Sequence, residues 1–146
     1  MSFVKQWLRL QNPARTVFTF ADLSSVAPEY VGAKLKSALK YAVKKQDIIR
    51  ISKGIYSLSK NYSKQEFANK YRSPSYVSLY TVLGEEGIVF QPYSSIYLVS
   101  SRSFEIEIDG QNYRYRKIKD EILFNTLGIK SVNGVSKATA ERALCD

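Results

Sequence analysis

The sequence predicts an α+β protein with two domains, and three observations support this prediction. Amphipathic helical patterns alternate with short β-prone runs along the whole chain. With 45% hydrophobic residues, the 146-residue chain can bury a core. Its net charge of +9 is uneven, because residues 1–60 carry 11 basic and 3 acidic residues, hence +8. The remainder has 11 basic and 10 acidic residues, and such asymmetry is typical of a polyanion-binding module beside a module with another role.

The composition excludes several classes of enzyme. The chain has no His, which excludes a Ser-His-Asp triad, a His metal cluster and an imidazole acid or base. Its one Cys, Cys145, permits neither an internal disulfide nor a thiolate zinc site. We therefore expect no enzymatic activity, catalytic residue, metal or cofactor. No apolar run approaches the roughly 20 residues of a membrane span, and the N-terminus lacks a signal-peptide pattern, so a soluble, cytoplasmic protein is expected.

The first domain is predicted to span residues 1–60. Residues 2–10 have apolar side chains at near-helical spacing and end before a helix-stopping Asn12-Pro13 pair. A short strand over 17–19 follows, and Thr19 can cap a second helix that begins at Phe20. The strongest helical pattern covers residues 30–45, and its apolar face consists of Val31, Leu35, Ala38, Leu39, Ala42 and Val43.

Two β-prone runs follow this helix, over residues 48–51 and 55–58. The loop Ser52-Lys53-Gly54 joins them into a hairpin, in which Gly54 supplies a positive φ. Helix, strand, helix, helix and hairpin is the element order of a winged helix-turn-helix, and we therefore predict this fold for residues 1–60.

The helix over residues 30–45 is the predicted DNA interface. Its polar face has no acidic residue, whereas ordinary solvated faces intersperse acids among the lysines. In a winged helix-turn-helix such a helix enters the major groove, with its N-terminal residues near base edges and its lysines near phosphates. The alternative is a solvated lysine face over a small core. The predicted contact residues are Tyr30, Ala33, Lys34, Lys36, Ser37, Lys40, Tyr41 and Lys44, together with Lys53 at the hairpin tip.

The second domain is predicted to span residues 61–146, as a small α+β domain with an antiparallel sheet. Its predicted helices cover residues 64–71, 76–86 and 120–127, with Ser73-Pro74-Ser75 starting the second of them and Gly87 and Gly128 ending the last two. Short strands are expected over 88–90 and 96–100. A final helix is expected over 137–146, and the absence of a C-terminal stop signal predicts that it is cut short.

The acidic residues Glu105, Glu107 and Asp109 alternate along one strand, so they project from one face. Clustered carboxylates can hold a divalent metal in a nuclease. The competing interpretation is a hairpin with a Gly110-Gln111 turn, which gives each strand complementary partners. We favour the hairpin, because it pairs Glu107 with Arg114, Glu105 with Arg116, Ile108 with Tyr113 and Ile106 with Tyr115.

Several segments of the chain resemble one protein family. Residues 68–79 (ANKYRSPSYVSL) resemble the Tyr-x-x-Pro-Ser-Tyr-[Ile/Val]-Ser-Leu segment of the AbiE-type abortive-infection antitoxins. Residues 96–100 (IYLVS) are similar to that family's central strand, and residues 113–118 (YRYRKI) to its Tyr-x-x-Arg-x-Ile strand. Residues 138–146 (ATAERALCD) resemble its Ala-[Ser/Thr]-Pro-Glu-[Lys/Arg]-Ala-Leu-x-Asp helix start, with Ala140 in place of Pro. Family members carry a winged helix where this chain has residues 50–56 (RISKGIY), and they continue beyond the position of Asp146.

The resemblance implies a transcriptional repressor and antitoxin of a bacterial toxin–antitoxin (abortive infection) system. Its winged helix would bind double-stranded operator DNA, with inverted repeats as the expected operator, and so autoregulate its operon. Its second domain would counter a cognate nucleotidyltransferase-like toxin. Two alternatives stay open. One is a protein-interaction module that inhibits such a toxin with only incidental DNA binding. The other is RNA binding, suggested by 11 Tyr residues, although many of these occupy apolar positions.

Overall fold

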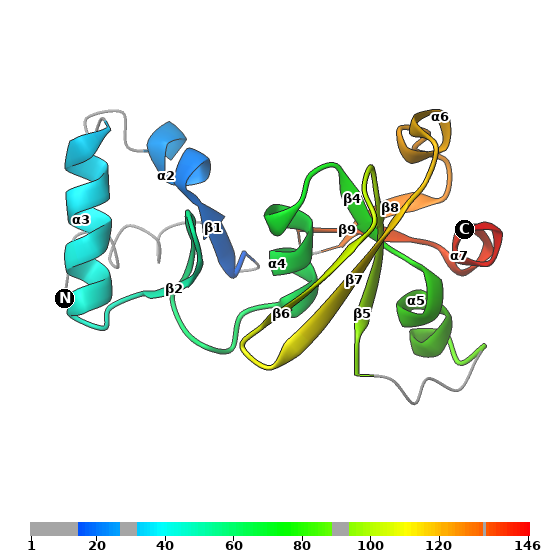
Figure 1. Ribbon diagram of the computed structural model, residues 1–146, viewed down its shortest axis with the longest axis horizontal. Coiled ribbons are helices and arrows are strands. Elements are labelled where there is room, and N and C mark those ends of the chain that lie inside the picture. Colours follow the sequence, from blue (N-terminus) through cyan, green and yellow to red (C-terminus); the bar gives the residue numbers. More distant parts are fainter. Residues whose placement is uncertain (1–14, 27–31, 89–93, 133) are drawn as a thin grey trace. The chain divides into compact units, whose positions relative to one another are not determined.

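The computed structural model describes residues 15–26, 32–88, 94–132 and 134–146. The chain divides into two compact units, Met1–Ser63 and Lys64–Asp146. Helices and sheets occur in both units, so the predicted α+β class is confirmed (Figure 1). The predicted helix over residues 2–10 lies outside the described residues, as do positions 89 and 90 of the predicted strand over 88–90.

The first unit contains one small antiparallel sheet and two described helices. Its strands pair in the order β1-β3-β2, so the first strand of the unit lies against the last. The strand, the two helices and the hairpin predicted between residues 17 and 58 are all present. Their bounds are β1 (Val17–Thr19), α2 (Phe20–Val26), α3 (Ala33–Lys44), β2 (Ile49–Ser52) and β3 (Ile55–Ser57).

The predicted cap at Thr19 is confirmed as a reciprocal pair of hydrogen bonds at the start of α2. The amide of Asp22 donates to Thr19 Oγ1 at 3.1 Å, and the amide of Thr19 donates to Asp22 Oδ2 at 3.0 Å. This arrangement satisfies two backbone N–H groups that the helix itself leaves without a partner. Arg15 Nη2 lies 2.8 Å from the same carboxylate oxygen, so this acid is engaged locally.

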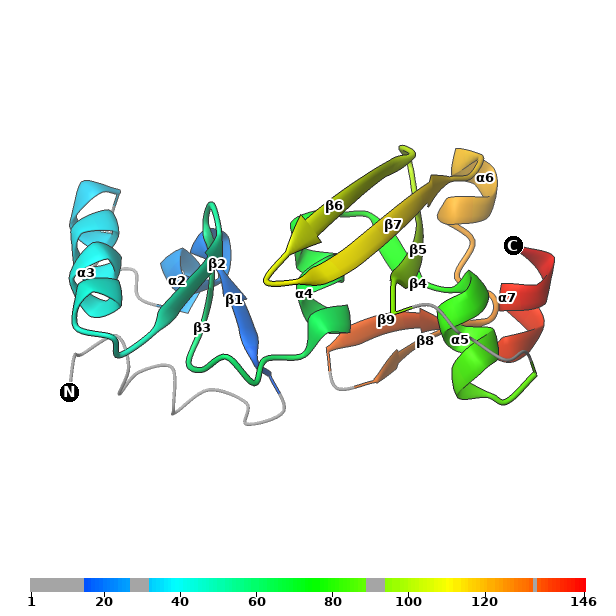
Figure 2. The same cartoon turned by 60° about the horizontal axis from the view of Figure 1, so that its bottom comes forward.

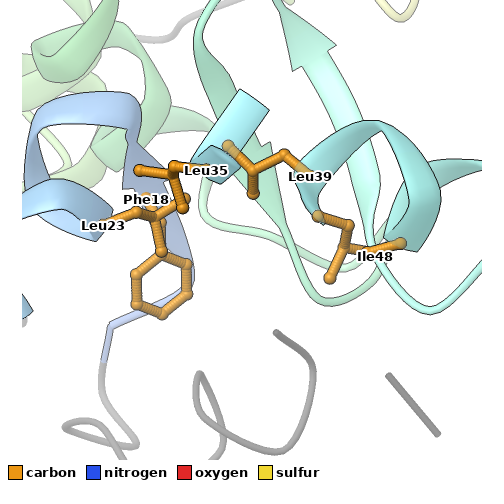
Figure 3. Close-up of a cluster of buried hydrophobic side chains, with 6 residues drawn as sticks. Phe18, Leu23, Leu35, Leu39 and Ile48 are labelled. Atoms are coloured by element: carbon orange, nitrogen blue, oxygen red, sulfur yellow. The ribbon is translucent and has the colours of Figure 1, made fainter. Parts of the chain in front are cut away.

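The core of the first unit forms where α3 meets α2 and the sheet. Leu35 and Leu39 of α3 pack with Phe18, Leu23 and Ile48, and all five side chains are buried (Figure 3). Burying a side chain of this size contributes about 1.5–3 kcal/mol. This cluster fixes which side of α3 faces inward, and therefore which side faces solvent.

The hairpin of the first unit turns at the predicted loop. Gly54 has φ +75°, a left-handed conformation that side-chain-bearing residues rarely adopt. Its carbonyl accepts a 2.8 Å hydrogen bond from the amide of Phe20, which connects the hairpin loop to the start of α2. The register between β2 and β3 shifts between Arg50 and Ser52, so the hairpin contains a bulge-like irregularity.

The second unit is built around a six-stranded sheet with the order β6-β7-β5-β4-β9-β8 (Figure 2). Four helices accompany the strands in the described residues. The bounds are α4 (Lys64–Tyr71), β4 (Ser75–Val77), α5 (Leu79–Glu85), β5 (Ile96–Ser100), β6 (Phe104–Ile108), β7 (Gln111–Lys117), α6 (Asp120–Leu123), β8 (Ile129–Val132), β9 (Val135–Ala138) and α7 (Ala140–Cys145).

The prediction of an antiparallel sheet is only partly correct, because the sheet is mixed. β5 runs parallel to β7 and β4 runs parallel to β9, whereas the other neighbours are antiparallel. Antiparallel hairpins such as β6–β7 leave a local turn signal in the sequence. The two parallel pairs join strands that are distant in the chain, and such pairs leave no local signal.

Three predicted helices of the second unit have different bounds in the structure. Residues 75–77 form β4, and the following helix starts only at Leu79, whose φ is +56°. The helix predicted over 120–127 ends at Leu123. The final helix starts at Ala140, because residues 135–138 form β9 at the centre of a ladder with β4 and β8. In the first and last of these cases strand pairing overrides the local helical pattern. Residues 124–127 form no strand, and the carbonyls of Asn125 and Leu127 accept hydrogen bonds from Arg142.

The β6–β7 hairpin is present, but its predicted turn is wrong by one residue, and each residue of β6 pairs with a β7 residue two positions earlier than predicted. The turn consists of Asp109 and Gly110 with φ +52° and +75°, which is the type I′ geometry that an Asp-Gly pair favours. Glu105 therefore lies opposite Arg114, and Glu107 lies opposite Asn112. Because a strand alternates with a period of two, this shift leaves every side chain on its predicted face.

Helices cover both faces of the large sheet. On one face, Phe67 of α4 meets the Tyr113 ring edge-on at 5.4 Å, and the Tyr115 hydroxyl donates to the Ala68 carbonyl at 2.6 Å. Burial raises the pKa of both tyrosines well above the ordinary value. The side chains that alternate with these, including Tyr97, belong to the opposite face, where α5 and α7 pack (Figure 1).

Candidate nucleic-acid interface

The solvent-facing side of α3 brings together seven of the nine predicted interface residues. Because Leu35, Leu39 and Ala42 point into the core, residues at the intervening helical positions must point outward. All seven lie outside this buried stripe, and α3 contains no Asp or Glu. They are Ala33, Lys34, Lys36, Ser37, Lys40, Tyr41 and Lys44.

We call these seven residues the basic face of α3, and the residues that the structure describes leave three of its four lysines without an ion pair. Among the described residues, Lys36, Lys40 and Lys44 form no ion pair. The carboxylate of Asp22, the acid of α2, is already engaged by Arg15 and Thr19. Lys36, Lys40 and Lys44 therefore present positive charge to solvent along one side of this 12-residue helix.

Tyr41 supplies an aromatic group within this charged surface. Its side chain is 56% exposed, which is unusual for a large ring on an otherwise well-packed helix. The ammonium group of Lys45 lies 5.6 Å from the ring centroid, in cation–π range. A tyrosine hydroxyl held this way can donate a hydrogen bond to a phosphate oxygen.

The remaining two predicted residues lie elsewhere. Lys53 is exposed in the β2–β3 loop, next to Gly54 and the start of α2, and is thus on a separate element from the basic face. Tyr30 lies outside the described residues. Sequence reasoning omitted two exposed basic residues near these elements, Lys45 at the end of α3 and Arg50 on β2. The strand alternation Ile49-Arg50-Ile51 is the signal that could have identified Arg50.

The three acids that suggested a metal site do not form one in the structure. Glu105 Oε1 lies 3.8 Å from Arg114 Nε, and Glu107 lies opposite Asn112. Asp109 belongs to the hairpin turn rather than to the strand. Across the described ranges, no group of three or more Cys, Asp or Glu side chains is arranged to hold a metal ion. The structure therefore offers no support for the nuclease interpretation.

Sequence reasoning missed a buried polar network in the second unit. Arg142 Nη2 donates to the Tyr76 hydroxyl at 3.2 Å, and this hydroxyl donates to Asp146 Oδ1 at 3.1 Å. Ser78 Oγ donates to Asp146 Oδ2 at 2.5 Å. Burial raises the pKa of Tyr76 to about 12, so its hydroxyl stays a donor in mildly alkaline solution as well as at neutral pH.

Arg142 also binds the chain segment that follows α6. Its guanidinium donates to the backbone carbonyls of Ile122, Asn125 and Leu127, and it lies over the Tyr76 ring at 5.0 Å. These carbonyls lie at and just beyond the C-terminal end of α6, where helices leave acceptors without partners. One side chain therefore ties α6, α7 and β4 together, and the network has a structural role.

The comparisons with known proteins give no family assignment. No protein-family model matches the chain, and no curated protein sequence matches it either. In the part of the chain that the structure describes, no helix is long and apolar enough to cross a membrane. Functional inference therefore rests on the geometry and charge described above.

Proposed function

We propose that the chain is a DNA-binding transcriptional repressor that autoregulates its operon and serves as the antitoxin of a toxin–antitoxin system. The observation that carries this proposal is the basic face of α3. It combines four lysines with small and aromatic residues, and α3 contains no acid. A surface of this kind neutralises phosphates, and phosphate neutralisation supplies a large share of the affinity of proteins for DNA.

The arrangement of the first unit favours a winged helix-turn-helix. The described elements follow the order β1-α2-α3-β2-β3, and β1 completes a sheet with the hairpin. In this fold the second helix of the helix-turn-helix, here α3, enters the major groove, and the hairpin acts as the wing. A helix about 10–12 Å across fits a groove about 12 Å wide.

Within such a complex the residues of the basic face have different roles. Ala33 and Ser37 are small, so they let the start of α3 approach the base edges closely. Lys36, Lys40 and Lys44 follow at helical spacing and would neutralise phosphates. Lys53 at the hairpin tip would contact the backbone beside the groove. The inferred partner is double-stranded operator DNA, with inverted repeats as the expected form.

A fluorescence anisotropy titration tests the proposal. The probe is a labelled duplex from the region upstream of the chain's own operon, and a scrambled duplex serves as the non-specific reference. We expect tighter binding to the upstream duplex, with affinity that falls steeply as salt rises. Lys40→Glu should weaken binding by about tenfold or more. Lys130→Glu, the same charge change at an exposed position of the second unit, is the matched control. Equal effects of the two variants would argue against the basic face.

The antitoxin part of the proposal rests on the second unit. The segments that resemble the AbiE-type antitoxins, residues 68–79 and 138–146, meet in the network of Tyr76, Ser78, Arg142 and Asp146. Co-expression with a neighbouring nucleotidyltransferase-like protein should relieve its toxicity. Lys40→Glu separates the two candidate functions. If the relief of toxicity depends only on inhibition of the toxin protein, the variant should still relieve toxicity. If the relief depends on repression, the variant should fail to relieve it.

A further inference from the structure

The second unit carries a groove of about 580 Å³ beside the sheet. Its walls come from α5 and α7, and its floor comes from β5, β6 and β7. α5 and α7 pack over the part of the sheet that contains Tyr76 and Tyr97, whereas the outward residues of β6 and β7 are exposed. The groove therefore lies where helical cover ends and the open part of the sheet begins. A volume of this size is within the roughly 300–1,000 Å³ range of small-molecule sites.

The lining is rich in aromatic and aliphatic side chains that remain accessible. Tyr80 is 51% exposed and Leu144 is 62% exposed, although both lie beside a well-packed sheet. Tyr80 meets the Tyr97 ring edge-on at 5.4 Å, so the two rings hold each other in place. Large exposed apolar side chains gathered around a groove are a feature of ligand-binding sites.

The strand side of the groove carries two arginines, Arg114 and Arg116, and one acid, Glu105, so its net charge is positive. Arg114 and Arg116 project from the same face of β7, and the Arg114 guanidinium lies 5.9 Å from the Tyr97 ring centroid. The contact between Arg114 and Glu105 is loose, at 3.8 Å, and Arg116 makes no ion pair with any described residue. Asp146 also lines the groove, but its side chain is only 3% exposed and is engaged by Tyr76, Ser78 and Arg142.

We propose that this groove binds a small organic anion with an aromatic body. The aromatic body would pack against Tyr80, Tyr97 and Leu144, and the anionic group would reach Arg114 and Arg116. Arginine pairs with carboxylate and phosphate through two parallel hydrogen bonds, which makes it suited to this role. Nucleoside monophosphates and aromatic carboxylates share this chemistry. The site lies in the second unit and does not depend on the proposed DNA interface in the first.

Two fluorescent probes with one aromatic framework separate the contributions of shape and charge. Anilinonaphthalene sulfonate carries one negative charge, and N-phenylnaphthylamine is the same framework without it. With the full chain we expect saturable, one-to-one binding of both, with the sulfonate bound more tightly. Raising the salt concentration should weaken the binding of the sulfonate but not that of the neutral probe, because salt screens the charge of the sulfonate.

Substitutions then locate the site. Arg116→Gln should weaken sulfonate binding about three- to tenfold, and the double change with Arg114→Gln should remove the preference for the charged probe. Leu144→Ala should weaken the binding of both probes. Because Leu144 is exposed, this substitution should not unfold the protein. Lys40→Gln on the basic face and Arg102→Gln, an exposed arginine outside the groove lining, are the controls and should change neither affinity.

Displacement of the sulfonate identifies the source of the ligand. Displacement by adenosine monophosphate points to nucleotides, and displacement by phenylpropionate points to aromatic carboxylates. Displacement by decanoate but by neither aromatic anion would overturn the aromatic part of the proposal. Equal affinities for the two probes, unchanged in the double arginine variant, would overturn it altogether. The proposal would also be overturned if Lys40→Gln weakened the binding of the sulfonate as much as Arg116→Gln does.

Discussion

The hydroxyl of Ser78 donates a 2.5 Å hydrogen bond to the side-chain carboxylate of Asp146, which lies 68 residues further along the chain. The Tyr76 hydroxyl donates to the other oxygen of this carboxylate, and Arg142 Nε lies 3.8 Å from it. The carboxylate is nearly inaccessible, so these neighbours replace water as its partners. The bond joins the β4–α5 connection to α7, and it explains physically why two distant segments contain matching polar residues.

Removing the arginine of this network should destabilise the second unit. Arg142→Met keeps an apolar stem but leaves Asp146 buried without its cation and removes the donor to three backbone carbonyls. We expect a loss of about 2–4 kcal/mol in the free energy of unfolding, measured by urea denaturation with near-ultraviolet circular dichroism. Arg102→Met, at an exposed position, is the control and should change stability by less than about 0.5 kcal/mol. Similar losses in the two variants would contradict the structural role of Arg142.

Local signals in the sequence were sufficient for most of the first unit. Thr19 and Gly54 mark a helix start and a turn through their own side-chain and backbone chemistry, and the structure confirms both. The apolar spacing of Leu35 and Leu39 is sufficient to orient α3, and hence to define its basic face. These features depend on residues close together in the chain.

The second unit was harder to predict because its organisation depends on distant pairs. The pattern of residues 75–77 is typical of a helix start, yet they form β4 by pairing with β5 and β9. Arg142 is an ordinary polar position in a helical pattern, and its partners only become apparent once residues 122–127 fold back against it. The groove beside Arg114 likewise combines residues from five elements, which no local pattern can reveal.

A cavity in the core of the first unit should impair DNA binding only through folding. Leu39→Ala removes a side chain that is 1% exposed and contacts the cluster around Ile48. We expect destabilisation of about 2–5 kcal/mol, measured by chemical denaturation. Tyr41→Ala, two positions along the helix but exposed, should change stability little while weakening DNA binding. The expectation is contradicted if Tyr41→Ala destabilises the unit as much as Leu39→Ala does.

The salt dependence of DNA binding should report how many lysines of the basic face neutralise phosphates. Each of Lys36→Gln, Lys40→Gln and Lys44→Gln should lower the slope of log affinity against log salt by about 0.9, because one fewer counterion is released. The slope is measured by anisotropy between about 50 and 200 mM salt. Lys130→Gln provides the control with the same loss of charge. An unchanged slope in all three variants would mean that α3 does not contact the backbone.

The raised pKa of Tyr76 predicts a loss of stability in alkali. Burial raises this pKa to about 12 from the ordinary value of 10.0. The folded state thus keeps the phenol proton more tightly than the unfolded state does, so its contribution is complete below about pH 10 and is lost as the pH rises towards about 12. Burial of Tyr113 and Tyr115 raises their pKa values in the same direction.

Urea midpoints measured at about pH 8, 10 and 11 should fall as the pH rises, and Tyr76→Phe should lessen that fall. Ser78→Ala removes a hydroxyl of the same network that does not titrate in this range, so it should lower the midpoint equally at every pH; a steepened fall in this control would contradict the assignment to Tyr76.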